Sequence, residues 1–383
     1  QLTLIILIFL NFDSQFIINR SAVRLRAGAP SLHKIIIYNR LIQFIYVNFS
    51  IKLIIMKKIL ISGGAGYLGT VLTLDLLKKN NVVVYDIMYF PWLLKNKRKI
   101  HNHKNLTIIK KRLSEVKKND FKNVDIVCDL NGISNDPSSE LNSKYTWNIN
   151  YFDRLKFAKL AKTSGVERYI INSTCSVYGF NKNRVYENST TNPISTYAKA
   201  NLKLEKKVMT LKSKKFKVNA LRNSTLFGFS HAMRLDLVIN NFVLNLSSNK
   251  KVKIDGVGDQ YRPFISVKDI CRVYKILIKN SKLPSFVCNL VHFNSKINKL
   301  TFKICKILKT KKSLINFRKD FSDKRNYNVG SKEFRKYFGK KFQFSSFNKE
   351  ILYLKKNLKR FKIKKNKNTM RVQFYKKTLL KKL

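Results

Sequence analysis

Glycines near residue 60 have the spacing of a phosphate-binding turn. The segment KKILISGGAGYLG runs from Lys57 to Gly69. Gly63 can adopt backbone angles closed to other residues, Gly66 has no side chain to hold off a pyrophosphate, and Gly69 allows a helix to pack closely on a strand. A helix beginning here would point unpaired N–H groups and a partial positive charge at the phosphates. The turn therefore predicts a dinucleotide site.

An acidic residue follows at the distance that such a site requires, about 20 residues beyond the glycines. Asp86 ends the apolar run Val82–Tyr85, which is typical of a second strand. A carboxylate there accepts hydrogen bonds from the adenosine ribose, and its charge would repel a 2′-phosphate. The combination favours NAD over NADP. The alternative is a set of buried loop glycines and a solvent-facing aspartate.

Strands and helices alternate from residue 57 onward, which predicts a parallel sheet that helices cover on both faces. The expected strands are short apolar runs at residues 59–61, 82–85, 106–109, 124–130, 169–172 and 218–221. Helices are expected at residues 70–79, 151–163, within 193–213, and at 236–246 and 269–279. The fold class is therefore α/β, a Rossmann-type doubly wound parallel sheet with a smaller C-terminal substrate-binding lobe.

Ligands of such sheets bind beyond the carboxyl ends of the strands. Leu130, Asn131 and Gly132 lie at the end of the fourth expected strand, and Thr174 lies at the end of the fifth. We therefore expect these residues to border one crevice together with the glycine turn and Asp86.

Composition divides the chain into four parts. Residues 1–55 are expected to be a poorly ordered extension outside the fold, 56–228 an NAD-binding domain, 229–361 mostly a substrate-binding lobe, and 362–383 a Lys-rich tail. The apolar run Leu2–Leu10 is shorter than the about 20 residues of a bilayer span, and Met56 directly precedes the glycine segment. The alternatives for the extension are part of a signal peptide or a membrane-surface anchor.

The chain is strongly basic, with 78 Lys plus Arg against 21 Asp plus Glu and a net charge of +57. Such a field attracts nucleic acid or anionic membrane. The basic residues are scattered, however, and no compact Arg-rich motif or aromatic RNA-binding signature occurs. We therefore favour compositional drift over specific nucleic-acid binding, and expect the basic surface to help gather a doubly anionic substrate.

The cysteines are odd in number and lack C-x-x-C spacing; they are Cys128, Cys175, Cys271, Cys288 and Cys305. This usage indicates a reducing compartment, here the cytoplasm, and argues against a disulfide scaffold or a zinc site. His101 and His103 have no partner ligands nearby in the sequence, so we expect them to be solvated rather than bound to a metal.

Four segments occur in the order and spacing of a known family. They are SGGAGYLG at 62–69, NSTCSVYG at 172–179, PISTYAKAN at 193–201 and RPFISVKD at 262–269. Together they resemble the extended short-chain dehydrogenase/reductase family, and more narrowly its NAD-dependent epimerase/dehydratase branch, which acts on nucleotide sugars. The resemblance covers residues 57–360.

The resemblance implies a mechanism. By position, Tyr197 would abstract a proton from a sugar hydroxyl while hydride passes to NAD, which leaves a keto-sugar intermediate. Thr174 would hydrogen-bond the same substrate oxygen. The phenol then needs a pKa lowered from about 10 toward neutrality. The implied cofactor-binding residues lie in the turn and at the strand ends: Gly63, Ala65, Gly66, Tyr67, Leu68, Gly69, Asp86, Leu130, Asn131 and Gly132.

The chain departs from the family four residues after Tyr197. Relatives have a lysine there that supplies positive charge and grips the nicotinamide ribose, whereas this chain has Asn201. Lys199 and Lys203 do not share the helix face of the tyrosine. Asn201 can hydrogen-bond the ribose but cannot lower the pKa of the phenol by charge. Two hypotheses follow: a variant enzyme, or an NAD-binding protein with little turnover that acts as a sensor or scaffold.

Two further departures concern the reaction and the adenine. Sugar 4,6-dehydratases of this family carry Asp-Glu after the threonine, whereas this chain has Cys175 and Ser176, which are not a competent acid–base pair at neutral pH. Epimerisation, or oxidation and reduction of a sugar carbon, is therefore favoured. Arg112 follows the third strand, where relatives usually have an aspartate that contacts the adenine.

The resemblance also implies substrate-binding residues. Arg262 stands where relatives pair an arginine with the substrate diphosphate, a task that suits a planar guanidinium. Arg234 is a second candidate, and Thr225 takes the place of a substrate-contacting asparagine. The alternatives are solvated charges for the arginines and a core-edge hydroxyl for the threonine. We expect a cytoplasmic NAD-dependent nucleotide-sugar epimerase or oxidoreductase that forms a homodimer, as relatives commonly do.

Overall fold

The computed structural model describes residues 56–92, 104–318, 325–339 and 342–379. Two expectations fall outside these residues, namely the extension over 1–55 and the solvated pair His101 and His103. Among the helices of the described ranges, none is both long and apolar enough to cross a membrane.

Seven parallel strands form the central sheet, in the order β11-β7-β5-β4-β1-β2-β3. Their bounds are β1 Lys58–Ser62, β2 Asn81–Tyr85, β3 Leu106–Ile109, β4 Ile126–Asp129, β5 Arg168–Thr174, β7 Lys217–Asn223 and β11 Phe286–Leu290. The chain winds outward in opposite directions from β1 and from β4, so a crevice opens beyond the carboxyl ends of these two strands. The predicted Rossmann-type sheet is confirmed.

Successive side chains of the central strands point to opposite faces, and both faces are buried. Ile59 and Ile61 belong to one apolar cluster, whereas Leu60 belongs to the other. The covering helices are α3 (Tyr67–Leu76) and α10 (Val267–Lys279) on the first face, and α7 (Arg154–Thr163) and α8 (Thr196–Met209) on the second. Continuous apolar runs such as these are what a doubly covered parallel sheet requires.

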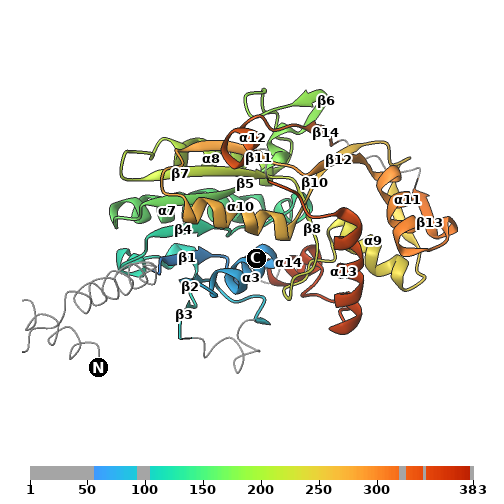
Figure 1. The fold of residues 1–383 in the computed structure, drawn as a ribbon, viewed down its shortest axis with the longest axis horizontal. Helices are drawn as coiled ribbons and strands as arrows, with labels where there is room; N and C mark the ends of the chain where they lie inside the picture. Colours follow the sequence, from blue (N-terminus) through green and yellow to red (C-terminus); the bar gives the residue numbers. More distant parts are fainter. Residues whose placement is uncertain (1–55, 93–103, 319–324, 340–341, 380–383) are drawn as a thin grey trace, which may run out of the picture. The chain divides into compact units, whose positions relative to one another are not determined.

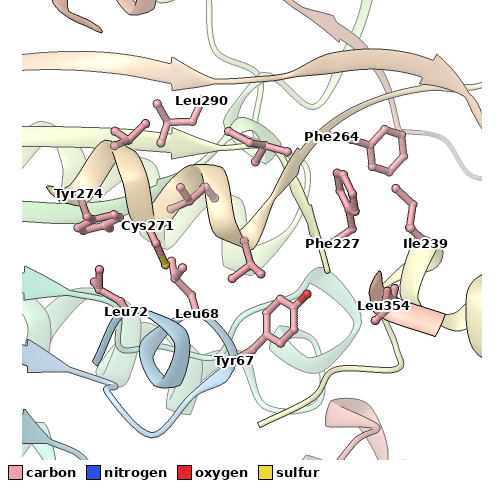
Figure 2. Close-up of a cluster of buried hydrophobic side chains, with 14 of the residues drawn as sticks. Tyr67, Leu68, Leu72, Phe227, Ile239, Phe264, Cys271, Tyr274, Leu290 and Leu354 are labelled. Atoms are coloured by element: carbon pink, nitrogen blue, oxygen red, sulfur yellow. The ribbon is translucent and has the colours of Figure 1, made fainter. Parts of the chain in front are cut away.

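Helix α10 lies against α3, although the sequence pattern predicted its segment in the smaller lobe. Figure 2 shows Leu68 and Leu72 of α3 facing Cys271 and Tyr274 of α10. Figure 1 shows α10 running across the sheet rather than beside the lobe. Helix α10 packs on the sheet because its apolar face is broad. The periodicity of the sequence predicts that face, but it does not show whether the face packs on the sheet or in the smaller lobe.

The smaller lobe gathers at one end of the sheet, where Figure 1 shows α9, α11, α13 and β13 together. It contains the strand groups β12-β10-β8 and β13-β9, and its elements are β8 Thr225–Phe227, α9 Val238–Ser247, β9 Val252–Asp255, β10 Tyr261–Ser266, β12 Phe293–Lys296, α11 Ile297–Leu308, β13 Ile315–Arg318 and α13 Phe347–Arg360. The remaining short elements are α5 Asp136–Ser139, α6 Ser143–Trp147, β6 Phe180–Val185, β14 Asn326–Val329 and α12 Glu333–Phe338.

The C-terminal segment differs from the predicted basic tail. Residues Arg371–Leu379 form helix α14, and Phe374 and Tyr375 are buried in a cluster with Ile133. The Phe374 ring lies 4.9 Å from the ring of Phe90. The prediction of a frayed tail was wrong because two aromatic side chains among many lysines are enough to dock one short helix.

Helix α7 also begins differently from the prediction of a helix over 151–163. A π-helical turn over Asn148–Asp153 precedes it. This turn places the amide of Asn150 against Ile133, whose backbone N–H and carbonyl it satisfies at 2.8 and 3.0 Å. The loop after β4 is thereby fixed next to the helix.

Candidate active site

The glycine turn is shaped by contacts that exclude side chains. Gly63 has a φ of 72°, and its N–H donates to the carbonyl of Tyr85 at 2.9 Å. A Cβ on Gly69 would lie 2.2 Å from the carbonyl oxygen of Gly63, so only glycine lets α3 start this close to β1. Gly66 is the N-cap of α3 and provides no side-chain cap for the first-turn amides. These amides suit the phosphates of a dinucleotide.

Asp86 holds the same turn from the end of β2. Its carboxylate accepts hydrogen bonds from the N–H of Ala65 at 3.0 Å and of Met88 at 2.7 Å. Burial raises the pKa of Asp86, although these two hydrogen bonds and the charge of Arg371 lower it. The carboxylate therefore fixes the glycine turn and also lines the cleft described next.

A cleft of about 400 Å³ opens beyond the carboxyl ends of β1 and β4. The predicted cofactor residues that line it are Gly63, Gly66, Tyr67, Leu68, Gly69, Asp86, Leu130, Asn131 and Gly132. Ala65 is buried behind them and contributes its amide to Asp86. Arg112, which replaces the usual adenine-contacting aspartate, also lines the cleft, beside Leu113 and Phe152. An apolar wall with a cation at its edge suits a flat aromatic base.

Tyr197 lies in the first turn of α8, half-buried and hydrogen-bonded to Thr174. Ser195 caps this helix by accepting a hydrogen bond from the N–H of Ala198 at 3.2 Å. Burial raises the pKa of Tyr197, whereas the hydrogen bond to Thr174 and the positive charges of Arg234 and Arg154 lower it. Contrary to the expectation for Thr174, neither Thr174 nor Tyr197 is among the residues that line the cleft, whereas Arg234, whose charge acts on Tyr197, does line it.

Asn201 is buried and uses both ends of its amide. The Nδ2 group donates to the carbonyl oxygen of Tyr197 at 2.8 Å, and Oδ1 accepts from Nη1 of Arg154 at 2.9 Å. Lys199 is exposed, and the Lys203 ammonium lies 5.0 Å from the ring centre of Tyr151.

Arg154 is the residue that sequence reasoning missed. Its Nε donates to Asp129 Oδ2 at 2.9 Å, and both side chains are buried. Asp129 also accepts from the hydroxyls of Ser62 at 2.7 Å and Tyr169 at 2.8 Å. Nothing in the sequence signals this pair, because Arg154 opens a helix in which other basic residues are exposed.

The predicted substrate residues are not all at the cleft. Arg234 lines it, pairs with Asp236 and donates to the carbonyl of Ser134 at 2.9 Å. Arg262 is buried in β10, with its guanidinium 5.3 Å from the ring centre of Tyr327, and it does not line the cleft. Thr225 begins β8 and is half-buried, and its neighbour Leu226 lines the cleft instead.

Cys175 follows Thr174 and is buried, with its thiol donating to the carbonyl of Arg222 at 3.1 Å. Burial raises the pKa of this thiol well above its usual range. The N–H of Ser176 donates to the Thr174 hydroxyl oxygen at 3.1 Å. The two residues after Thr174 therefore shape the turn and present no acid to a ligand.

Comparison with known proteins gives a consistent picture. The NAD dependent epimerase/dehydratase family matches residues 59–289, more than half of the chain. An uncharacterized UDP-glucose epimerase of Bacillus subtilis is 30% identical over 223 residues, which cover 55% of this chain and 69% of that protein. A dTDP-D-glucose 4,6-dehydratase of Dictyostelium discoideum is 27% identical over 60% of this chain and 57% of its own length.

Solved structures share the fold. A UDP-glucose 4-epimerase of Thermotoga maritima with UDP-glucose has a TM-score of 0.70 at 19% identity, over 80% of this chain and 100% of the other. A UDP-glucuronic acid 4-epimerase of Bacillus cereus, in complex with UDP-glucuronic acid and NAD, has a TM-score of 0.69 at 20% identity, over 79% and 99%. At this identity the likeness concerns the fold alone.

Proposed function

Because the chain belongs to the NAD-dependent epimerase/dehydratase family, we propose that it is a nucleotide-sugar epimerase or oxidoreductase that works through a keto-sugar intermediate. NAD, when bound, supplies a reversible acceptor for the hydride of a sugar carbon. One observation carries the proposal: Tyr197 is hydrogen-bonded to Thr174 and electrostatically coupled to Arg234, which lines the same cleft as the glycine turn.

Tyr197 is the acid/base group in this proposal. A phenolate takes the proton of the sugar hydroxyl, and the phenol returns it at the end of the cycle. Burial raises the pKa of Tyr197, so nearby positive charge is needed to bring that pKa toward neutrality. Arg154 and Arg234 supply such charge from the protein, and Thr174 orients the substrate oxygen.

The proposal favours epimerisation or oxidation and reduction over 4,6-dehydration, although some relatives carry the dehydratase name. Elimination of water needs a positioned acid–base pair next to the sugar. Cys175 is buried and neutral, and the amide of Ser176 is engaged with Thr174. Neither side chain can take the part of a carboxylate.

The substrate is proposed to be a nucleotide sugar. Arg234 faces the cleft and can approach a diphosphate or a sugar hydroxyl. Arg262 and Thr225 stay proposed as substrate-binding residues on the family resemblance, although neither lines the cleft. The division into an NAD-binding part over 56–228 and a mostly substrate-binding part over 229–361 belongs to the same proposal.

The second candidate function is an NAD-binding protein of the same fold with little turnover. It is favoured by Asn201, whose amide is hydrogen-bonded to Tyr197 and Arg154 and brings no charge of its own. A sensor or scaffold needs the cofactor cleft but not a reactive phenol.

One experiment separates the two. The full chain is incubated with NAD and a panel of UDP-, GDP- and dTDP-sugars, and products are followed by NMR and by NADH absorbance. We expect one sugar to give an epimer or keto product, with the rate lost in Tyr197→Phe and kept in Tyr353→Phe, a change at an exposed tyrosine. NAD binding without any product from the whole panel would favour the second candidate.

We also propose a cytoplasmic homodimer. All five cysteines are buried and free, as suits a reducing compartment. The dimer is proposed because members of the family commonly form dimers through two helices. Light scattering on the purified chain tests it, and a monomer at micromolar concentration would contradict it.

A further inference from the structure

Helix α14 forms part of the cleft wall, although it lies beyond the residues that match the family. Arg371 and Tyr375 line the cleft together with the glycine turn. Phe374 and Tyr375 pack in the cluster that includes Phe90, and the N–H of Leu235 donates to the carbonyl of Thr369 at 2.7 Å just before the helix. Apolar and backbone contacts therefore hold helix α14 against the cleft that the glycine turn borders.

Arg371 is a buried cation without a carboxylate partner among the described residues. Its side chain is 3% exposed. The guanidinium donates to the carbonyl of Asn368 and, at 3.5 Å, to that of Ala232, and its central carbon lies 3.2 Å from the ring centre of Phe90. Asp86 and Asp236 act on this charge but form no ion pair with it, and a buried charge without a direct partner is costly, so an anion from outside the chain is expected beside it.

The cleft already holds a second guanidinium. Arg234 is paired with Asp236, whereas Arg371 is not. Burial and the charge of Arg234 lower the pKa of Arg371 to about 10, which leaves Arg371 protonated at neutral pH. The wall formed by these two residues therefore carries net positive charge and favours a bound anion with more than one oxygen.

The position of Arg371 along the cleft identifies that anion. Arg371 lines the cleft together with Asp86, at the expected adenosine end, and with Arg234. Arg234 in turn interacts with Tyr197, at the catalytic end. The part of a dinucleotide that lies between its adenosine and its nicotinamide is the pyrophosphate. The amides of the glycine turn line the same cleft.

We propose that Arg371 binds the pyrophosphate of NAD, so that helix α14 is a working part of the cofactor site. The inference rests on the proposed function only through its cofactor, since it needs NAD to bind but no sugar to react. The glycine turn then contacts the pyrophosphate through backbone amides, and Arg371 contacts it through a guanidinium from the C-terminal helix. Hydrogen bonds to charged groups are the strongest that a side chain can add here.

The first test compares Arg371→Gln with Lys377→Ala, which removes one positive charge from an exposed position of the same helix. Dissociation constants for NAD, ADP-ribose and UDP are measured by calorimetry on the full chain. We expect Arg371→Gln to weaken NAD and ADP-ribose about tenfold to a hundredfold and to leave UDP unchanged. Lys377→Ala should leave all three unchanged. Unchanged NAD affinity in Arg371→Gln, or a loss confined to UDP, would overturn the proposal.

The second test uses the unaltered chain, because a change at a buried arginine can also weaken folding. Hydrogen exchange of the amides in residues 366–379 is followed with and without ADP. We expect ADP to slow exchange there as well as in the glycine turn. Protection of the turn without protection of α14 would overturn the proposal. A chain that binds NAD in this way but converts no sugar would contradict the proposed function alone.

Discussion

Asn201 accepts a hydrogen bond from Arg154 at 2.9 Å, in a site where the two side chains are 3% and 1% exposed. Asn201 also donates to the carbonyl oxygen of Tyr197, four residues earlier on α8. Arg154 comes from α7, so positive charge reaches the tyrosine from a different helix. That charge lowers the pKa of Tyr197, although burial raises it more. The nearest positive charges that lower this pKa are therefore those of arginines, Arg234 and Arg154, and not of a lysine on α8.

The first prediction concerns Arg154 and stability. Arg154→Met leaves the carboxylate of Asp129 buried without its counter-ion, so we expect the free energy of unfolding to fall by about 3–5 kcal/mol. Lys159→Ala, at an exposed position of the same helix, should change it by less than about 0.5 kcal/mol. Urea denaturation followed by circular dichroism measures both. A similar small loss in both variants would mean that the pair contributes little.

The second prediction concerns charge at Asn201. Asn201→Asp places a carboxylate against Arg154 and offsets the positive charge that lowers the pKa of Tyr197, so that pKa should rise. Turnover at neutral pH should fall about tenfold for each unit by which that pKa rises. Asn201→Ala also loses the hydrogen bond to the Tyr197 carbonyl, loses the one from Arg154 as well, and adds no charge, so it should leave the pKa nearly in place. Carbon NMR of ring-labelled tyrosine reports the titration directly, and an equal shift in both variants would refute a charge effect.

The third prediction is the pH dependence of turnover. The deprotonated phenol is the reactive form, and burial raises the pKa of Tyr197. Because that pKa lies above the usual value of a phenol, kcat/KM should increase with pH and should still be rising well to the alkaline side of neutrality. Tyr197→Phe should lose about 100-fold to 10,000-fold in rate and show no such limb. A flat profile in the unaltered chain would point to another base.

Much of the sheet could be predicted from the sequence because buried parallel strands consist of short, continuous runs of apolar residues. The run Val82–Tyr85 became β2, and Asp86 at its end lines the cleft. A strand of this kind can be recognised from residues that are adjacent in the sequence. The glycine turn could be placed for the same reason, since its conformation is set by the few residues that form it.

Arg154 and Arg371 could not be predicted because their partners are distant in sequence. Arg154 meets Asn201 across 47 residues, and Arg371 meets Ala232 across 139. In a chain with 78 Lys and Arg, no local pattern separates a buried guanidinium from a solvated one. Which basic side chains are buried is determined by the tertiary structure and not by the local sequence.

The last prediction concerns Asp86, which both braces the glycine turn and lines the cleft. In Asp86→Asn one oxygen remains an acceptor, but the new NH₂ group faces a backbone N–H of Ala65 or Met88 and cannot accept from it. We expect the free energy of unfolding to fall by about 1–3 kcal/mol and NAD affinity to fall at least about tenfold.

The same substitution removes the charge that would repel a 2′-phosphate, so NADP should lose less affinity than NAD, and the ratio of their dissociation constants should move toward one. Asp75→Asn is the matched control, because Asp75 lies on α3 and pairs with lysines away from the cleft. It should leave both affinities unchanged. Calorimetry with the two cofactors measures the ratio. Equal losses for NAD and NADP would assign Asp86 to the support of the turn alone, because a carboxylate that also met the ribose would distinguish the two cofactors.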